Sequence, residues 1–302
     1  MMLLMRTKRL IQAKQITQLI RRGGMFEMQK NRMFDIHMHV IPEVDDGSWS
    51  LEMSCNMLRD AYMQGVRSVI ATPHGSAFLN DAGRVYENFR KLKQAWEGFV
   101  ASDAQFRSYM GDDPLSLYLG CEVFCSIEEI PDGDAQDGES GDVTAGKGKT
   151  PDFLDSLQRG LVPSLNETEY VLVEFDPMVR PGEAVMIVIL LVSFGWIPVI
   201  AHAERYPNLR CDGEMDGLLE EGCLLQINVG SLTDRYYDEA EWQWARHLLR
   251  EKKVTFSGTD AHRTTYRPPA VKDGIRYILE NCEKEYAEKI LFQNAQEMLL
   301  EV

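Results

Sequence analysis

The chain has 302 residues, of which 44% are hydrophobic, and this is enough for one large core or two smaller ones. The formal net charge is −15 at pH 7, but residues 1–32 hold eight Lys and Arg against one acid, so they carry +7 and the rest carries −22. A strongly acidic body disfavours nucleic acid and anionic membrane surfaces as partners.

Residues 1–32 form a basic, mildly amphipathic stretch. We expect either a translated extension upstream of a natural start at Met33 or a nearby methionine, or a flexible tail. A membrane-surface or partner helix is the third alternative. No long apolar block with a small-residue cleavage site marks a secretory signal, so we expect a cytoplasmic protein without membrane insertion.

Residues 184–203 carry no formal charge and are rich in Ile, Val and Leu, as a membrane span would be. Gly195 and Pro198 interrupt this stretch, however. A buried helix at 181–194 followed by a strand from 197 is therefore the favoured interpretation.

The six cysteines form no Cys-x-x-Cys pair and sit mostly in apolar, periodic stretches. This pattern predicts free, buried thiols in a reducing compartment. No cysteine is followed by Arg six positions later, so the Cys-x5-Arg loop of cysteine-based phosphatases is absent.

From residue 33 onward, short β-type runs alternate with amphipathic helical stretches. The predicted strands are 33–39, 67–72, 117–123, 170–175, 197–202, 224–228 and 254–259. The predicted helices are 51–64, 83–100, 152–159, 181–194, 213–221, 236–252 and 270–299. Strands that alternate with helices through right-handed crossovers form a parallel sheet, and seven such units predict a closed or nearly closed α/β barrel.

Residues 132–150 interrupt this alternation. They are rich in Gly, Asp and Ser and have almost no large apolar residue, so we expect a mobile, acidic loop insertion. Its acidic residues suggest calcium, but their spacing does not match an EF-hand loop, and a solvated loop is favoured.

Ionisable side chains collect where the predicted strands end. His37 and His39 alternate along the first strand and should face the same way, with Asp46 close behind. The later strand ends carry His74, Glu122, Glu174, His202, Asp260 and His262. Active sites of α/β barrels lie at the carboxyl ends of the strands. Only His247, in the middle of a predicted helix, lies elsewhere among the six histidines.

Each of these residues has an ordinary structural explanation when it is taken alone. His74 could be a turn residue, Glu174 could pair with Arg205, and Asp260 could cap a helix. Together, however, burying so many ionisable groups at one barrel mouth would cost much folding free energy unless a counter-charge compensates them. Metal ions supply that charge, and mixed imidazole and carboxylate ligands suit Mn²⁺, Fe or Zn²⁺.

The order of these motifs resembles the PHP (polymerase and histidinol phosphatase) superfamily, and more closely its bacterial protein-tyrosine phosphatases of capsule and exopolysaccharide operons. The motifs are His-x-His, Asp-Asp-Gly, Thr-Pro-His, two glutamates, Ala-His-x-Glu-Arg-Tyr, Asp-x-His and Arg-Pro-Pro. The resemblance runs from about residue 33 to the C-terminus. Departures are the 132–150 insertion, the N-terminal extension, and Ala203 where proline is frequent.

The resemblance implies a single-domain, distorted (β/α)7 TIM-like barrel over 33–302 with about three divalent metal ions, Mn²⁺ being the first choice and Fe or Zn²⁺ the others. The implied ligands are His37, His39, Asp46, His74, Glu122, Glu174, His202, Asp260 and His262. Glu122 would bridge two ions, and Asp46 rather than Asp45 would be the ligand and a catalytic residue. Arg205 and Arg267 would clamp the phosphate.

The implied activity is metal-dependent hydrolysis of phosphotyrosine in a protein, through attack of a metal-activated water on phosphorus. The implied partner is an autophosphorylating bacterial tyrosine kinase that controls capsule or exopolysaccharide synthesis. The main alternative is a PHP phosphatase that acts on a small phosphoester such as histidinol phosphate. An amidohydrolase-type metal hydrolase is a second alternative, but no lysine that could be carbamylated stands at a predicted strand end. An inactive binding module is a third alternative, and it would not need every ligand position to be filled.

Overall fold

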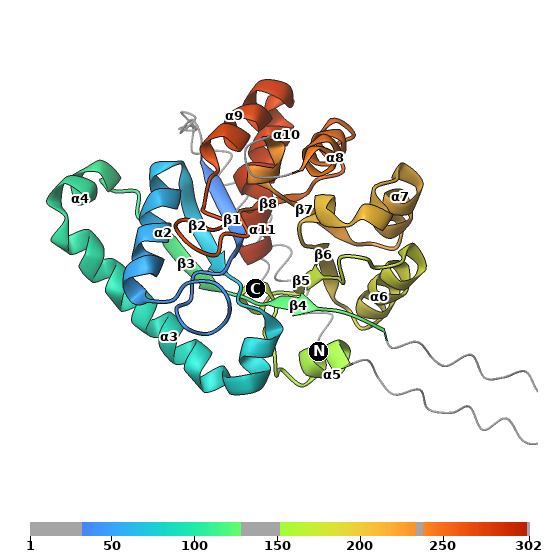
Figure 1. Cartoon of the computed structure of the whole chain (residues 1–302), viewed down its shortest axis with the longest axis horizontal. Helices are drawn as coiled ribbons and strands as arrows, with labels where there is room; N and C mark the ends of the chain where they lie inside the picture. The colour runs from blue at the N-terminus through green and yellow to red at the C-terminus, as the bar shows by residue number, and fades with distance from the viewer. Residues whose placement is uncertain (1–31, 128–151, 234–237, 301–302) are drawn as a thin grey trace, which may run out of the picture.

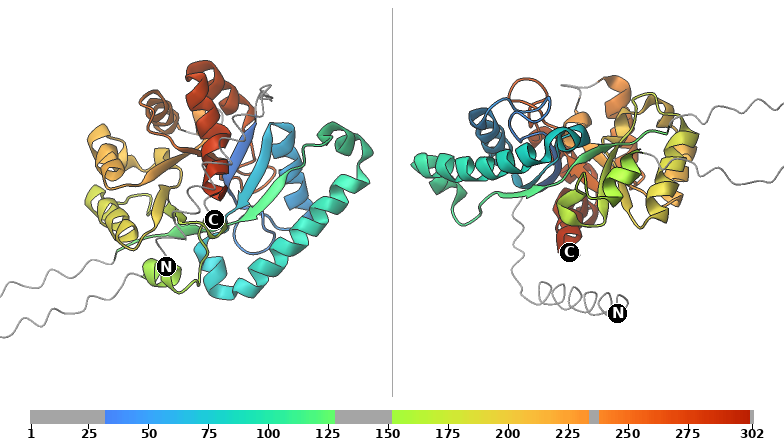
Figure 2. Two further views of the ribbon diagram at one scale, coloured as in Figure 1. Left: turned by 180° about the vertical axis from the view of Figure 1, so that it is seen from behind. Right: turned by 90° about the horizontal axis from the view of Figure 1, so that it is seen from below.

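The computed structural model describes residues 32–127, 152–233 and 238–300. In these residues the strands are β1 (Met33–Met38), β2 (Val66–Ala71), β3 (Ser116–Leu119), β4 (Glu122–Phe124), β5 (Tyr170–Glu174), β6 (Ile197–Ile200), β7 (Leu224–Asn228) and β8 (Phe256–Gly258). The α-helices are α2 (Leu51–Met63), α3 (Gly75–Ser102), α4 (Ala104–Met110), α5 (Asp152–Gln158), α6 (Pro181–Ser193), α7 (Asp212–Glu220), α8 (Glu239–Arg250), α9 (Lys272–Asn281), α10 (Lys284–Glu288) and α11 (Asn294–Leu300). Most helices lie outside the strands (Figures 1 and 2).

All paired strands are parallel and follow chain order, in one sheet of β1-β2-β3 and another of β4-β5-β6-β7-β8. The last strand region returns to the first through a parallel bridge between Met38 and Ala261. Two main-chain hydrogen bonds support this bridge, from His39 N to Ala261 O at 2.9 Å and from Asp260 N to His37 O at 2.7 Å. The predicted parallel α/β barrel is thereby confirmed.

The predicted strand 117–123 is divided into β3 and β4 at Gly120 and Cys121. The chain keeps its pairing through the break, since Gly120 N donates to Ala71 O at 2.9 Å and Glu122 N donates to Pro73 O at 3.1 Å. Gly120 is squeezed there, because a Cβ atom would lie 3.0 Å from side-chain carbons of Ile70 and Leu165. The eight strands therefore occupy seven positions around the barrel.

The helices follow the predicted pattern with three local differences. Helix α3 starts at Gly75 rather than at 83, and it contains a break at Asp81, whose side chain accepts a hydrogen bond from Arg84 N and caps the second part. The predicted helix 270–299 is divided into α9, α10, a π-helical turn (Lys289–Gln293) and α11. Helix α4 was not predicted.

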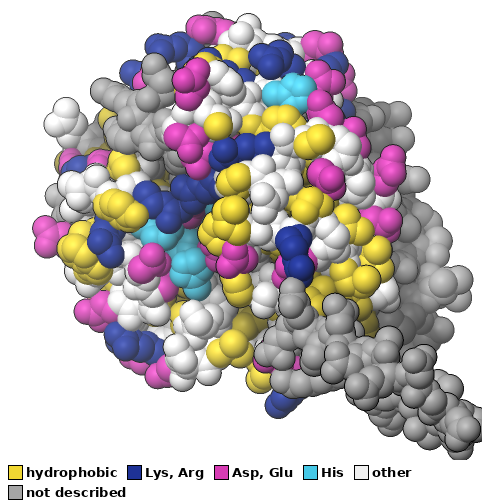
Figure 3. Space-filling model, turned by 45° about the vertical axis from the view of Figure 1, so that its right-hand side comes forward, with side chains coloured by type: hydrophobic (Ala, Val, Ile, Leu, Met, Phe, Trp, Pro, Cys, Tyr) yellow, Lys and Arg dark blue, Asp and Glu magenta, His cyan; other side chains and the backbone are white. Residues whose placement is uncertain are grey.

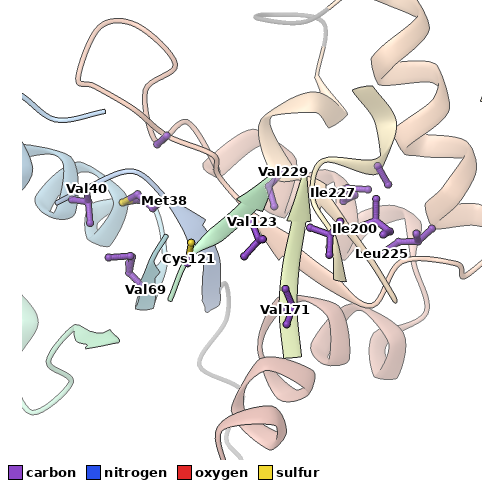
Figure 4. Packing of buried hydrophobic residues seen from close by; sticks show 14 of the residues in the cluster. Met38, Val40, Val69, Cys121, Val123, Val171, Ile200, Leu225, Ile227 and Val229 are labelled. Atoms are coloured by element: carbon purple, nitrogen blue, oxygen red, sulfur yellow. The ribbon is translucent and has the colours of Figure 1, made fainter. Parts of the chain in front are cut away.

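Hydrophobic side chains fill both faces of the strands. The larger cluster lies between strands and helices and includes Met38, Val69 and Ile200, as Figure 4 shows. A second, smaller cluster is formed by residues in or next to the strands, by Leu165 in the turn before β5 and by two residues of α11: Phe34, Ile36, Ile70, Leu165, Leu172, Val199, Ala201, Phe256, Ala295 and Met298. Because side chains alternate along a strand, we assign this second cluster to the barrel interior.

An irregularity in β1 prepares the site. Asp35 pairs with Val69, and Met38 pairs with Ala71. Three residue steps along β1 therefore match two residue steps along β2. Such an extra residue is a β-bulge, which re-aims the side chains that follow it. Ile36 and His37 both lie within the bulge; Ile36 belongs to the interior cluster, whereas His37 and His39 are buried at the site.

No helix among the described residues is both long enough and apolar enough to cross a membrane. The uncharged stretch at 184–203 forms α6 and β6, as predicted. The extension at 1–32, apart from Arg32, and the insertion at 132–150 lie outside the described residues, so these two assignments stay predictions.

Candidate active site

The nine predicted ligand residues converge at one end of the barrel, where they follow the carboxyl ends of β1, β2, β3, β5, β6 and β8. Histidine side chains are visible there in a hollow bordered by Lys and Arg side chains (Figure 3). Three overlapping groups have ligand atoms within 4.8 Å of one another. They are His39, Asp46, His74 and His262; His37, His39 and Glu122; and His74, Glu122 and Glu174.

Glu122 is the centre of the cluster and is buried. Its Oε1 lies 3.2 Å from His37 Nε2 and 3.1 Å from His202 Nε2, and its Oε2 lies 3.2 Å from His39 Nε2 and 3.1 Å from His74 Nδ1. Burial opposes ionisation, but the surrounding histidines hold the pKa of Glu122 well below its usual value. The four imidazoles come from three strand ends, and this one carboxylate joins them.

Asp45 holds His39 in place. Its Oδ2 lies 2.8 Å from His39 Nδ1, which leaves Nε2 of the same ring facing Glu122. Burial works against both charges, yet the pair lowers the pKa of Asp45 to about 2 and, with Glu122, raises the pKa of His39 to about 10. Asp45 also accepts hydrogen bonds from the main-chain N–H groups of Gly47 and His74.

Asp46 lies at the open side of the cluster. Its side chain is 60% exposed, and its Oδ1 lies 3.4 Å from His74 Nε2 and 3.5 Å from His262 Nε2. Glu174 completes this side, with Oε2 at 3.6 Å from His74 Nδ1. Burial, and then the charge of Glu122, raises the pKa of Glu174 to about 6.

Asp260 connects the histidines to two arginines. It is buried, its φ of 53° is left-handed, and its Oδ1 lies 3.4 Å from His37 Nε2. Its Oδ2 accepts hydrogen bonds from Arg205 Nη1 at 2.6 Å and Asn228 Nδ2 at 3.2 Å, and it also pairs with Arg267. One simpler alternative is therefore wrong, because no described helix begins directly after Asp260. Arg205 pairs with Asp260, and its predicted alternative partner was Glu174.

His202 and His262 occupy buried positions that disfavour the charged imidazole. Burial comes first among the causes that lower the pKa of each to about 3. The backbone N–H of His202 donates to Gln226 Oε1 at 2.9 Å, and its φ of 33° turns the chain sharply after β6. Within the described part of the chain, His202 Nδ1 has no hydrogen-bond partner.

This donor set fits divalent metal ions. His37 Nε2 and His39 Nε2 lie 3.2 Å apart with Glu122 and Asp260 oxygens around them, an arrangement that brings imidazole lone pairs together. A cation between them would satisfy both nitrogens and compensate the carboxylates. Nitrogen and oxygen ligands without thiolate suit Mn²⁺, Fe or Zn²⁺.

Several supporting residues were missed as functional positions. Asp35 accepts hydrogen bonds from Thr259 N, Thr259 Oγ1 and His37 N, and so ties β8 to β1 beneath the cluster. Gln226 Oε1 lies 3.2 Å from His37 Nδ1, and Asn228 follows two residues later on the same face of β7. The available signal was this period-two spacing of polar residues in otherwise apolar strands.

A family model described as capsular polysaccharide synthesis, CpsB/CapC, matches residues 33–136 and 149–300. The tyrosine-protein phosphatase CpsB of Streptococcus agalactiae serotype III is 27% identical over 274 residues, which are 88% of this chain and 98% of that protein. The tyrosine-protein phosphatase YwqE of Bacillus subtilis is 29% identical over 275 residues, which are 88% of this chain and 91% of that protein.

Solved structures agree with these matches. One from a study of YwqE from Bacillus subtilis and CpsB from Streptococcus pneumoniae, described as metal-dependent tyrosine phosphatases, has a TM-score of 0.68 at 27% identity and covers 88% of this chain and 94% of that chain. A mutant organophosphorus hydrolase of Deinococcus radiodurans has a TM-score of 0.52 at 14% identity, covers 90% of this chain and 93% of that chain, and shares the fold alone.

Proposed function

Because this chain belongs to the CpsB/CapC family of capsular polysaccharide synthesis, we propose that it is a metal-dependent phosphatase that removes phosphate from phosphotyrosine in proteins. The observation that carries the proposal is the convergence of five histidines and four carboxylates on one barrel mouth beside two arginines. This site chemistry favours hydrolysis of a phosphoester, since it combines cation ligands with phosphate-binding guanidinium groups.

We propose up to three divalent ions at the site, with Mn²⁺ as the first choice. Bound there, the ions would acidify a water and neutralise charge on the phosphoryl oxygens. The four proposed ligand carboxylates and Asp45 contribute −5, three such ions +6, and Arg205 and Arg267 +2, so the site would attract a phosphate although the whole chain carries −15. Solvent screening limits that overall repulsion to roughly 8–10 Å, which makes the local charge decisive.

The residues of the chain have separate roles in this proposal. Glu122 contacts four imidazoles with its two oxygens, and it would hold metal ions together with them. Arg205 and Arg267 lie at the mouth with side chains 24% and 26% exposed, and their planar guanidinium groups would orient the phosphoryl group. Asp46, the most exposed carboxylate of the set, would act at the side from which the substrate arrives.

A tyrosine ester suits this site chemically. The phenolate leaves with a pKa near 10, so it needs less help from a proton donor than a serine alkoxide does. We also propose that no cysteine takes part in the reaction. Cys121 and Cys125 are the cysteines nearest to Glu122 in sequence, both are buried, and burial raises the pKa of each thiol well above its usual value.

The proposed substrate is a phosphotyrosine protein of a capsule or exopolysaccharide system, and an autophosphorylating tyrosine kinase is its proposed source. Family membership and the names of the relatives support the capsule context. Histidinol phosphate serves as the comparison substrate, because the PHP superfamily also includes phosphatases of small phosphoesters.

Metal removal tests the proposal. The full chain should hydrolyse a phosphotyrosine peptide, lose that activity after EDTA treatment and dialysis, and recover it with Mn²⁺, because the clustered carboxylates and imidazoles need a cation. Undiminished activity in a protein shown by elemental analysis to be metal-free would contradict the metal-dependent mechanism. Faster turnover of histidinol phosphate than of the peptide would contradict the proposed substrate.

A matched pair of histidine variants sharpens this test. His37→Ala should lower both metal content and kcat/KM by more than about 100-fold, since even outer-shell partners of a metal are worth roughly 10–100-fold. His247→Ala is the control, because His247 lies away from the cluster and pairs with Asp212 at 2.8 Å. Equal losses in the two variants would contradict the assigned site.

A further inference from the structure

Two aromatic side chains and one arginine form a group that we call the aryl rim: Trp49, Arg263 and Tyr266. The guanidinium carbon of Arg263 lies 4.0 Å from the ring centroid of Trp49 and 5.8 Å from that of Tyr266. Both distances are within the range of a cation–π interaction. The rings come from segments more than 200 residues apart in the chain, and a single cation holds them together.

The aryl rim adjoins the proposed metal ligands directly. Arg263 Nη2 donates to Asp46 O at 2.8 Å, and Arg263 Nε donates to Gly47 O at 3.3 Å. Arg263 is the residue after His262, and Tyr266 is the residue before Arg267. The rim therefore lies where Asp46, the exposed ligand, opens the cluster to solvent.

The rings are exposed despite their size. Trp49 is 58% exposed and Tyr266 is 59% exposed, so most of each ring's apolar surface stays in water. Aromatic side chains of this kind, with an arginine among them, are typical of recognition surfaces rather than of cores. Their place beside a catalytic cluster points to the substrate as the group they contact.

We propose that Trp49 and Tyr266 bind the aromatic ring of the substrate phosphotyrosine and that Arg263 holds the two rings in position. This inference rests on the proposed function. It adds to that function the side chains that would distinguish an aryl phosphate from an alkyl phosphate. One ester oxygen separates phosphorus from the ring of phosphotyrosine, so a phosphate held at the cluster places that ring at the mouth. A serine ester offers no ring to this surface.

The aryl rim predicts a defect in substrate binding that spares the phosphate site. In the metal-loaded full chain, Trp49→Ala should raise KM for a phosphotyrosine peptide about three- to ten-fold, the usual worth of an aromatic contact. The inhibition constant of inorganic phosphate, which has no ring, should stay within about two-fold. Trp49→Phe should restore most of the lost affinity, and Tyr266→Ala should resemble Trp49→Ala.

Tyr109→Ala is the matched control, because Tyr109 is 56% exposed on α4, away from the mouth. The inference is overturned if Trp49→Ala leaves KM unchanged. It is also overturned if the phosphate constant and the metal content change together with KM, since that result would mean a general disturbance of the ligand loop. If the wild-type protein with its metals bound does not hydrolyse phosphotyrosine, the proposed function fails and the inference fails with it.

Discussion

Asp45 and Asp46 are neighbours in the chain but occupy different environments. Asp45 is buried against His39, while the side chain of Asp46 is 60% exposed beside His74 and His262. Both oxygens of Asp45 accept hydrogen bonds, Oδ2 from the His39 ring and His74 N, and Oδ1 from Gly47 N. Asp45 thus orients the ring of a proposed ligand, and Asp46 is the aspartate that we propose as a metal ligand.

Asparagine cannot replace Asp45, because both Asp45 oxygens accept hydrogen bonds. In asparagine one of these oxygens becomes an NH₂ group, which would face a hydrogen-bond donor. Asp45→Asn should therefore weaken Mn²⁺ binding by roughly 10–100-fold, the usual cost of losing the partner that orients a metal-binding histidine. Titration of the metal-free protein with Mn²⁺ would measure this change. Asp155→Asn, at an exposed ion pair with Arg159, should bind Mn²⁺ like the wild type. Identical affinity in both variants would contradict the assigned role.

Residue type and spacing made the proposed ligands predictable, and the supporting residues were harder to find. The spacing of His37 and His39 along one strand, together with the metal-binding chemistry of imidazole, predicted them as ligands. Asp35 and Gln226 look like ordinary polar residues in a strand until their partners from β8 and β6 are known. Those partners are distant in sequence, so composition and period carry no information about them.

At the scale of elements, helix α9 is fixed to the barrel by a close contact at Gly274. A Cβ atom at this position would lie 2.1 Å from Val229 O and 2.6 Å from Val229 Cγ1. The helix and the segment after β7 would have to separate to make room for it. A Cβ atom at Gly98, in the long helix α3, would meet no other described part of the chain within 4 Å, apart from the backbone of its own helix and its chain neighbours.

These two glycines predict opposite effects of the same substitution. Gly274→Ala should lower the free energy of unfolding by about 1–3 kcal/mol, the usual cost of overpacking. Gly98→Ala should raise it by about 0.5–1 kcal/mol, because alanine is the better helix former. Denaturant unfolding of the two variants beside the wild type would measure both changes. A stabilising Gly274→Ala would mean that the contact with Val229 is looser than described.

Element type was predictable from hydrophobic periodicity, but the boundaries set by tertiary contacts were not. The apolar run at 117–123 is divided because Gly120 fits closely between Ile70 and Leu165, which come from other parts of the chain. The break in α3, by contrast, is marked by a local side-chain cap at Asp81. Seven strand positions survived both differences, because the alternation of strand and helix does not depend on exact ends.

At the scale of the whole molecule, two seams join the two sheets into a barrel. One seam is the bridge between Met38 and Ala261, and the other is the bridge between His74 and Glu122. The proposed ligands lie over both seams, since the His39 ring is shared between Glu122 on one side and Asp260 on the other. Metal ions bound there would tie the two sheets together at both seams.

Metal loading should therefore stabilise the entire fold. Binding to the native state alone adds about 2.7 kcal/mol when free metal is 100 times its Kd, and this corresponds to a rise in Tm of roughly 4–5 °C for a chain of this size. Calorimetry of the metal-free protein with and without Mn²⁺ would measure the shift. His37→Ala should lose it and His247→Ala should keep it. An unchanged Tm at saturating Mn²⁺ would contradict this coupling.

The spread of the ligands along the chain has a consequence for how the protein becomes active. His37 and His262 are 225 residues apart (262 − 37), yet both contact the same small cluster. The chain must therefore be synthesised past residue 262 and closed into its ring before the cluster can exist. A nascent or prematurely terminated polypeptide that stops before residue 262 lacks a proposed ligand, so the proposed phosphatase activity would report on closure of the barrel.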